Sequence, residues 1–182
     1  MKKITTREMA MCGIMAALMC IAGPLSVPVG PVPVTLMNLA IFFSIAVLHM
    51  RLTLISCVVY LLLGMAGLPV FSGFSGGAAK IAGPTGGYLI GYLFMILIGG
   101  VLYEHSQDRL LPGICGILVG LAVLYLFGTA WFVSQMKVSA GYALTVCVWP
   151  FIPFDVIKLL AAVPVGRMVR RTLFRAGFAE EL

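Results

Sequence analysis

The chain has 182 residues, of which 62% are hydrophobic and only 10% are charged. A soluble globular domain carries roughly 25% charged residues, so this composition excludes an ordinary water-facing surface. The net charge is +6, but the basic residues are scattered along the chain and do not form a basic stripe with stacking aromatic residues. This argues against a nucleic-acid partner. We therefore predict a single integral membrane domain over residues 1–182, with membrane lipid around it.

Charged residues and clusters of Pro and Gly divide the chain into six apolar stretches. Several are only 15 to 18 residues long. About 20 residues cross a bilayer core unaided, so we expect tilt, local thinning or packing in a larger complex. The sequence predicts an all-α membrane protein, a six-transmembrane-helix bundle with long outer loops, whose spans lie near residues 9–23, 35–49, 52–67, 86–103, 112–133 and 153–169.

Three connections between these stretches differ from short loops. Residues 24–33 contain four prolines, which cannot continue a helix because each ring fixes φ and removes a backbone donor. Residues 68–87 form a long, Gly-rich apolar loop. Residues 134–152 are expected to contain a short helix from Ser139, which can cap it, to Val148. If all three connections lie on one side, they form a lid over a site between helices.

The basic residues are divided unequally between the two sides of the predicted bundle. The outer loops hold Lys80 and Lys137, and Lys158 falls inside the last span. Because cytoplasmic loops carry the excess of Lys and Arg, we predict a multi-pass cell-membrane protein with both termini in the cytoplasm. The cytoplasmic side then holds nine of the twelve basic residues, namely Lys2, Lys3, Arg7, Arg51, Arg109, Arg167, Arg170, Arg171 and Arg175.

Asp155 and Lys158 are the strongest candidates for a binding site. They stand three positions apart, on one face of a helix. A charged side chain in a membrane helix costs about 2.5 to 3.5 kcal/mol on insertion scales, so it usually pairs, lines a cavity or binds a ligand. Pro153 suits the first turn of a helix, which places Asp155 near the positive end of the helix dipole. The alternative is a mutual ion pair with a structural role only.

The string GPTGGY, residues 83–88, lies at the predicted start of the fourth helix. Gly86 and Gly87 would allow a polar ligand to approach the backbone amides, and Tyr88 is a candidate contact. Gly87 and Gly91 also form a small-xxx-small pair, so helix packing is an equal alternative for the glycines.

Other candidates come from the loops and from two helix ends. Phe71 and Phe74 lie in the Gly-rich loop, where they can close over an apolar ring. Thr35 and Asn38 open the second helix, where capping of backbone amides is the ordinary role of Thr35. The small residues Gly13 and Ala17 form a helix face that suits close docking of a partner helix or packing inside the chain.

Motifs of catalysis and metal binding are missing from the sequence. His49 and His105 are far apart, and there is no Gly-x-Ser-x-Gly, His-Glu-x-x-His or phosphate-loop motif. The five cysteines lie in apolar runs without the spacing of a zinc or dithiol site. We expect no enzyme activity, no metal and no cofactor, and any energy from ATP would come through another subunit.

Five strings, GPVPVTLMNLAIF, GLPVF, GPTGGYLIGY, YLFGTAW and PFIPFDVIK, follow one another along the chain. In this order they resemble the BioY family, the biotin-specific substrate-binding (S) components of energy-coupling-factor (ECF) transporters. The resemblance runs from about residue 10 to about residue 170. It implies six helices, an outward-facing biotin pocket, and as partners a transmembrane coupling protein and two ABC-type ATPase subunits.

The resemblance assigns substrate contacts to Asp155, to Lys158 and to the segment 83–88. Asp155 can accept from the ureido N–H groups of biotin, and Lys158 can donate to the ureido oxygen or to the carboxylate. Three positions depart from the family pattern: the family often has Gln where Met37 stands and Gly where Phe154 stands, and some members have Asn where Gly73 stands. A polar contact to the ligand would then be missing, and Asn38 is a candidate replacement for it.

The leading hypothesis is a biotin-binding transport component. The alternatives are an S component or carrier for another vitamin or a biotin precursor, an intramembrane enzyme, and a purely structural membrane subunit.

Overall fold

The computed structural model describes residues 4–28, 32–106 and 109–176. Lys2 and Lys3 of the basic count, and Gly30 and Pro31 of the proline-rich connection, lie outside this part. The described chain is mostly helical. Its elements are α1 (Thr6–Ala22), β1 (Ser26–Val27), β2 (Val34–Thr35), α2 (Met37–Val47), α3 (Met50–Met65), α4 (Ala78–Ala82), α5 (Gly86–His105), α6 (Leu110–Met136), α7 (Ala140–Cys147) and α8 (Phe151–Arg175).

Each of the six predicted apolar stretches coincides in large part with a helix of eleven residues or more. By length and apolar composition, α5 and α6 can each cross a membrane, and α7 with α8, which meet at a bend of 43°, form a third candidate span. The helices α2 and α3 are apolar but shorter. The described residues therefore support two or three spans directly, and six remains a prediction.

Local sequence signals explain where several helices begin. The Thr5 hydroxyl accepts from the Glu8 amide at 3.2 Å while the Glu8 carboxylate accepts from the Thr5 amide, which closes a capping box before α1. The predicted cap of the short helix α7 is confirmed, because Ser139 Oγ accepts from the Tyr142 amide at 3.3 Å. Pro153 lies in the first turn of α8, as expected.

Two of the three unusual connections contain structure that the sequence pattern did not indicate. Strands β1 and β2 pair antiparallel, with Ser26 opposite Thr35 and Val27 opposite Val34. Pro28 and Pro33 flank the paired residues rather than occupying them, so no proline has to donate to the ladder. The Gly-rich connection contains α4 and an isolated bridge between Phe71 and Ser75.

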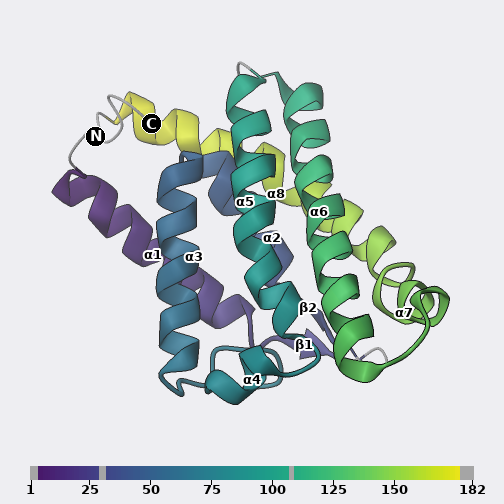
Figure 1. Cartoon of the computed structure of the whole chain (residues 1–182). Coiled ribbons are helices and arrows are strands. Elements are labelled where there is room, and N and C mark those ends of the chain that lie inside the picture. Colours follow the sequence, from purple (N-terminus) through teal and green to yellow (C-terminus); the bar gives the residue numbers. More distant parts are fainter. Residues whose placement is uncertain (1–3, 29–31, 107–108, 177–182) are drawn as a thin grey trace.

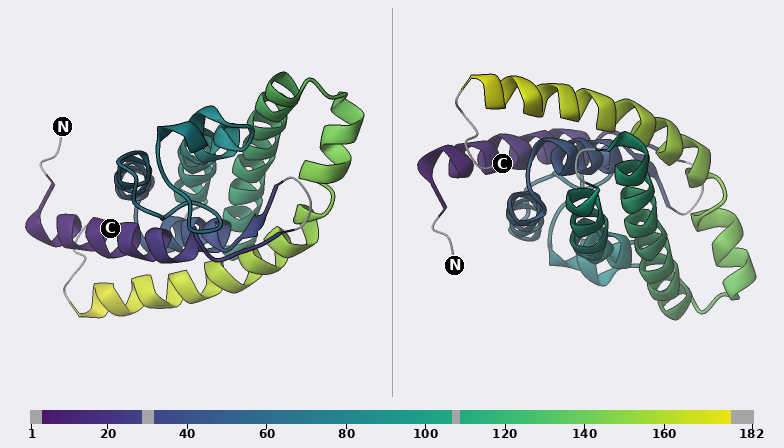
Figure 2. Two further views of the ribbon diagram at one scale, coloured as in Figure 1. Left: turned by 90° about the horizontal axis from the view of Figure 1, so that it is seen from below. Right: turned by 90° about the horizontal axis from the view of Figure 1, so that it is seen from above.

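The three connections lie at one end of the bundle. Figure 1 shows the hairpin, α4 and α7 at the lower end, whereas the start of α1, the turn from α2 to α3 and the end of α8 are at the upper end. In Figure 1, α1 and α8 run obliquely past the more upright α3, α5 and α6, and in Figure 2 they run across the view while α3 is seen end-on. We call the lower end the loop end and the upper end the basic end, after Arg7, Arg51, Arg109 and the arginines of α8.

Helix α2 is the centre of the packing. Nine of its eleven residues are buried, because it contacts α1, α3, α5 and α8. Small residues bring other helices together: a Cβ atom on Gly120 of α6 would lie 2.8 Å from Cα of Gly99 in α5. Glycine at both positions allows this close approach of the two helices. The helices thus hold the start of α2 against the starts of α5 and α8 at the loop end.

Candidate functional site

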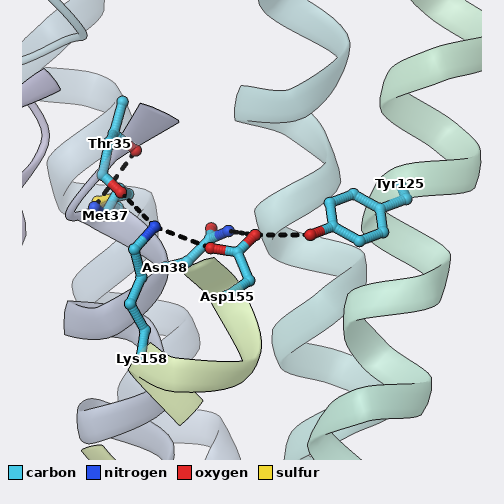
Figure 3. A network of polar contacts seen from close by, with 6 residues as sticks. All are labelled: Thr35, Met37, Asn38, Tyr125, Asp155 and Lys158. Carbon is cyan, nitrogen blue, oxygen red and sulfur yellow. Dashed lines mark hydrogen bonds and ion pairs between the residues drawn. The ribbon is translucent and has the colours of Figure 1, made fainter. Parts of the chain in front are cut away.

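The buried carboxylate of Asp155 is the centre of a polar network at the loop end (Figure 3). Asp155 is 1% exposed, in the second turn of α8. Its Oδ1 accepts from Lys158 Nζ at 2.8 Å. Its Oδ2 accepts from Asn38 Nδ2 and from the Tyr125 hydroxyl, both at 2.7 Å. Three donors from α8, α2 and α6 therefore compensate one charge that a membrane protein would otherwise bury at high cost.

Lys158 connects the same charge to the hairpin. Its ammonium group donates to Asp155 Oδ1 and also to the backbone carbonyl of Thr35, at 2.8 Å in both cases. Lys158 is 8% exposed, so this pair is shielded from bulk water. The predicted spacing of three residues does bring the two side chains together as an ion pair. An ammonium group has three donors, and these two contacts use two of them.

Asn38 has a buried acceptor without a protein partner among the described residues. Its Nδ2 must face Asp155, because a carboxylate oxygen can only accept, and this fixes the orientation of the amide. The other atom of the amide, Oδ1, is buried and makes no hydrogen bond within the described structure. A buried polar atom left unsatisfied costs about 1 to 3 kcal/mol, so this oxygen is a candidate for contact with a ligand.

The network lies on the wall of a cavity that holds about 650 Å³ of space outside the protein atoms, part of it open to solvent. The wall combines aromatic and apolar side chains with few charged ones, and its charged groups are Asp155, Lys158 and Lys80. Such a wall suits a small molecule that is largely apolar and has polar groups at defined positions.

Five of the residues predicted from sequence line this cavity: Thr35, Asn38, Tyr88, Asp155 and Lys158. Thr35 also has the expected local role, since its Oγ1 accepts from the Met37 amide at 3.3 Å. The Tyr88 hydroxyl lies 3.0 Å from Thr129 Oγ1 on α6.

Four other candidates are not among the residues that line the cavity. Phe71 is fully buried, with its ring over Gly64 and 5.6 Å from the ring of Tyr60. Phe74 is 67% exposed. Gly86 and Gly87 are buried in packing, where an added Cβ would meet the backbone of Ile81 and the side chain of Trp131 respectively.

Gly13 and Ala17 are also remote from the cavity. Both are exposed on α1, and a Cβ on Gly13 would have no protein atom within 4 Å. Packing inside the described chain therefore does not explain this small-residue face.

Sequence reasoning missed several polar residues of the cavity wall, among them Tyr92, Tyr125 and Lys80. Tyr125 opens the string YLFGTAW, which was used for the family resemblance but not for the site. Lys80 was counted only as a charge of an outer loop. Tyrosines on long apolar helices resemble ordinary packing residues, so only the arrangement of α5 and α6 reveals that these two face the cavity.

The model of the BioY family matches residues 1–175. A Thermotoga maritima protein named biotin transporter BioY is 36% identical over 166 residues, which cover 91% of this chain and 96% of that protein. A Pyrococcus horikoshii protein named probable biotin transporter BioY is 35% identical, with 90% and 96% covered.

One solved structure also matches. It is the 2.1 Å crystal structure of an S-component for biotin from an ECF-type ABC transporter, and it aligns with a TM-score of 0.85 and 29% sequence identity. The alignment covers 93% of this chain and 95% of that chain.

The hydrogen bond between Tyr125 and Asp155 can be tested by measuring the stability of a variant that lacks it. Tyr125→Phe keeps the ring but removes a hydroxyl that donates to a buried charge, and such bonds contribute about 1.5 to 3 kcal/mol. We expect the free energy of unfolding, measured by SDS titration in mixed micelles, to fall by about that amount. Tyr142→Phe is the control, because that side chain is exposed on α7. Equal stability of the two variants would contradict the role of the hydroxyl.

Proposed function

This chain belongs to the BioY family, and we propose that it is the biotin-binding S component of an ECF-type uptake transporter rather than an enzyme. The observation that carries the proposal is the buried network of Asp155, Lys158 and Asn38 on the wall of a cavity. The names of the relatives and of the matching crystal structure support biotin as the substrate. We further propose one integral membrane domain over residues 1–182, with six membrane-crossing helices.

The hydrogen-bonding capacity of the network suits the ureido group of biotin, which has two N–H donors and one carbonyl acceptor. Asn38 Oδ1 has no partner within the described structure and accepts one N–H. A carboxylate has about four acceptor positions, and three donors reach Asp155, so it can accept the second N–H. The third donor of Lys158 is then available to the ureido oxygen.

This assignment leaves the carboxylate of biotin for a different cation. Lys80 enters the cavity wall from α4, whereas the network belongs to α2, α6 and α8. The ammonium group of Lys158 already neutralises Asp155, so Lys80 is the cation that can balance an additional negative charge. We propose that Lys80 binds the carboxylate and that Tyr88 and Thr35 contribute to the wall. Phe71, Gly86 and Gly87 support the wall through packing rather than through contact with biotin, whereas Phe74 is 67% exposed and takes no part in that packing.

The second candidate for the substrate is another vitamin or a biotin precursor. A biotin precursor with the ureido group but without the sulfur-containing ring would use the same polar anchors, so the anchors alone do not separate the two. Competition of such a precursor against radiolabelled biotin measures the contribution of the apolar wall.

The exposed small-residue face of α1 supports a protein partner. Gly13 and Ala17 leave open space beside the helix, which allows another helix to approach closely. We propose that this face docks on a transmembrane coupling protein, which two ABC-type ATPase subunits energise. The family relationship supports this kind of partner.

The orientation in the cell membrane follows from the two ends of the bundle. The basic end carries the excess of arginine, which supports a cytoplasmic position for both termini, and the loop end with the cavity then faces outward. This orientation lets the cavity capture biotin from outside.

The anchors are tested by equilibrium binding of radiolabelled biotin to the detergent-solubilised chain. Asp155→Asn and Lys158→Met each remove one charge-assisted contact, which costs roughly 1.5 to 3 kcal/mol, so affinity should fall about ten- to a hundredfold. Lys137→Met, an exposed lysine at the end of α6, is the control. If both anchor variants fold and bind biotin like the parent, the pair is only structural and the site assignment is wrong.

The same assay separates the two ends of the ligand. Lys80→Gln should weaken the binding of biotin but not of its uncharged amide, whereas Asp155→Asn should weaken both. Equal effects of Lys80→Gln on the acid and the amide would contradict its contact with the carboxylate.

The proposed docking face of α1 is tested by introducing a large side chain into it. Ala17→Trp fills the open space beside α1, so we expect biotin binding to persist while co-purification with a coupling protein is lost. Ala122→Trp places the same side chain on an exposed position of α6 and should leave both properties intact. Normal co-purification of the Ala17→Trp protein would exclude this face as the interface.

The orientation is tested by thiol labelling in a cysteine-free background. A cysteine at position 74, exposed at the loop end, should react with a membrane-impermeant maleimide in intact cells. A cysteine at position 6, at the start of α1, should react only after permeabilisation. Labelling of position 6 in intact cells would reverse the proposed topology.

A further inference from the structure

The basic end of the bundle has a cleft of its own, separate from the biotin cavity. It lies between the start of α6 and the last three turns or so of α8, and it holds about 850 Å³ of space outside the protein atoms, part of it open to solvent. Figure 1 shows these two segments at the end opposite to the hairpin and α4. Nothing in the recognition of biotin requires this cleft.

Three arginines give one wall of the cleft a strong positive charge. Arg167, Arg171 and Arg175 follow one another at intervals of four residues, so they share one face of α8 with a rise of about 6 Å between neighbours. Arg171 and Arg175 are exposed. A guanidinium group stays charged and binds phosphate oxygens in a bidentate manner, so this wall favours an anion with phosphate geometry.

The rest of the wall is apolar and continues onto the side of α8 that faces outward from the bundle. Leu110, Pro164 and Met168 line the cleft, and Met168 is 72% exposed. Toward the middle of the bundle, Leu160 and Val165 are also exposed. Along α8 the exposed surface therefore changes from apolar to basic at this cleft, as expected at the boundary between the hydrocarbon core and the headgroups of a membrane.

We propose that the cleft binds the phosphodiester headgroup of an anionic phospholipid, with Arg171 and Arg175 on the phosphate and the first part of an acyl chain against Leu110 and Met168. A free anion would satisfy only the arginines, whereas a phospholipid matches the charged and the apolar wall together. With the proposed cytoplasmic position of this end, the lipid belongs to the inner leaflet, where basic pockets between helices bind anionic headgroups.

The proposal is tested by native mass spectrometry of the full chain in a nonionic detergent. The chain is titrated with phosphatidylglycerol and with phosphatidylcholine of the same acyl chains. We expect phosphatidylglycerol to bind about tenfold more tightly. In the double variant Arg171→Gln, Arg175→Gln this preference should disappear, with the binding of phosphatidylcholine unchanged.

A matched control removes the same charge from the same end. Arg7→Gln, Arg51→Gln has the same net charge as the cleft variant but leaves the cleft intact, so the preference for phosphatidylglycerol should persist. Both double variants should bind radiolabelled biotin like the parent. This readout shows that they fold, and it separates failure of the lipid site from failure of the proposed function.

Three results would overturn the proposal. If both double variants lost the preference for phosphatidylglycerol equally, the lipid would be held by general charge attraction and not by the cleft. Complete displacement of the lipid by an equal concentration of inorganic phosphate would assign the arginines to a free anion. Unchanged lipid binding in the cleft variant, together with lost co-purification of a coupling protein, would assign them to an acidic protein surface.

Discussion

The compensation of one buried charge organises the loop end of this protein. An ionised Asp155 at 1% exposure is tolerable because Lys158, Asn38 and Tyr125 all donate to it. Those donors come from three helices that are far apart in sequence, and Lys158 extends the network to the hairpin. Removing the carboxylate would therefore leave several elements without their common partner. The same charge that fixes the starts of α2 and α8 also leaves acceptor capacity at the cavity wall.

The sequence predicted those features of the fold and the site that depend on local chemistry. The three-residue spacing of Asp155 and Lys158, the cap at Ser139 and the position of Pro153 require only one helix each, and the structure confirms all three. The family resemblance rested on short strings in order, and the comparisons confirm it. The three unusual connections do lie at one end of the bundle, as expected for the predicted outer loops.

Features that depend on contacts between distant segments could not be predicted in the same way. Tyr125 is an ordinary aromatic residue of a long apolar helix until α6 is packed beside α8. Phe71 is in a Gly-rich connection, yet its ring fills the space over Gly64, where any larger residue would clash. The hairpin is only two residues per strand, too short for an alternating pattern to indicate it. In each case tertiary packing, rather than local propensity, determines the position.

The bond between Lys158 and the carbonyl of Thr35 has a consequence for how such a pocket can diversify. Every amino acid supplies a backbone carbonyl, so the strand stays fastened to the charged network whatever side chain occupies position 35. The side chain at that position is on the cavity wall. The attachment of the strand and the surface offered to a ligand thus belong to different atoms of one residue, so an exchange of the side chain would give up the bond from the Met37 amide but not the attachment of the strand to Lys158.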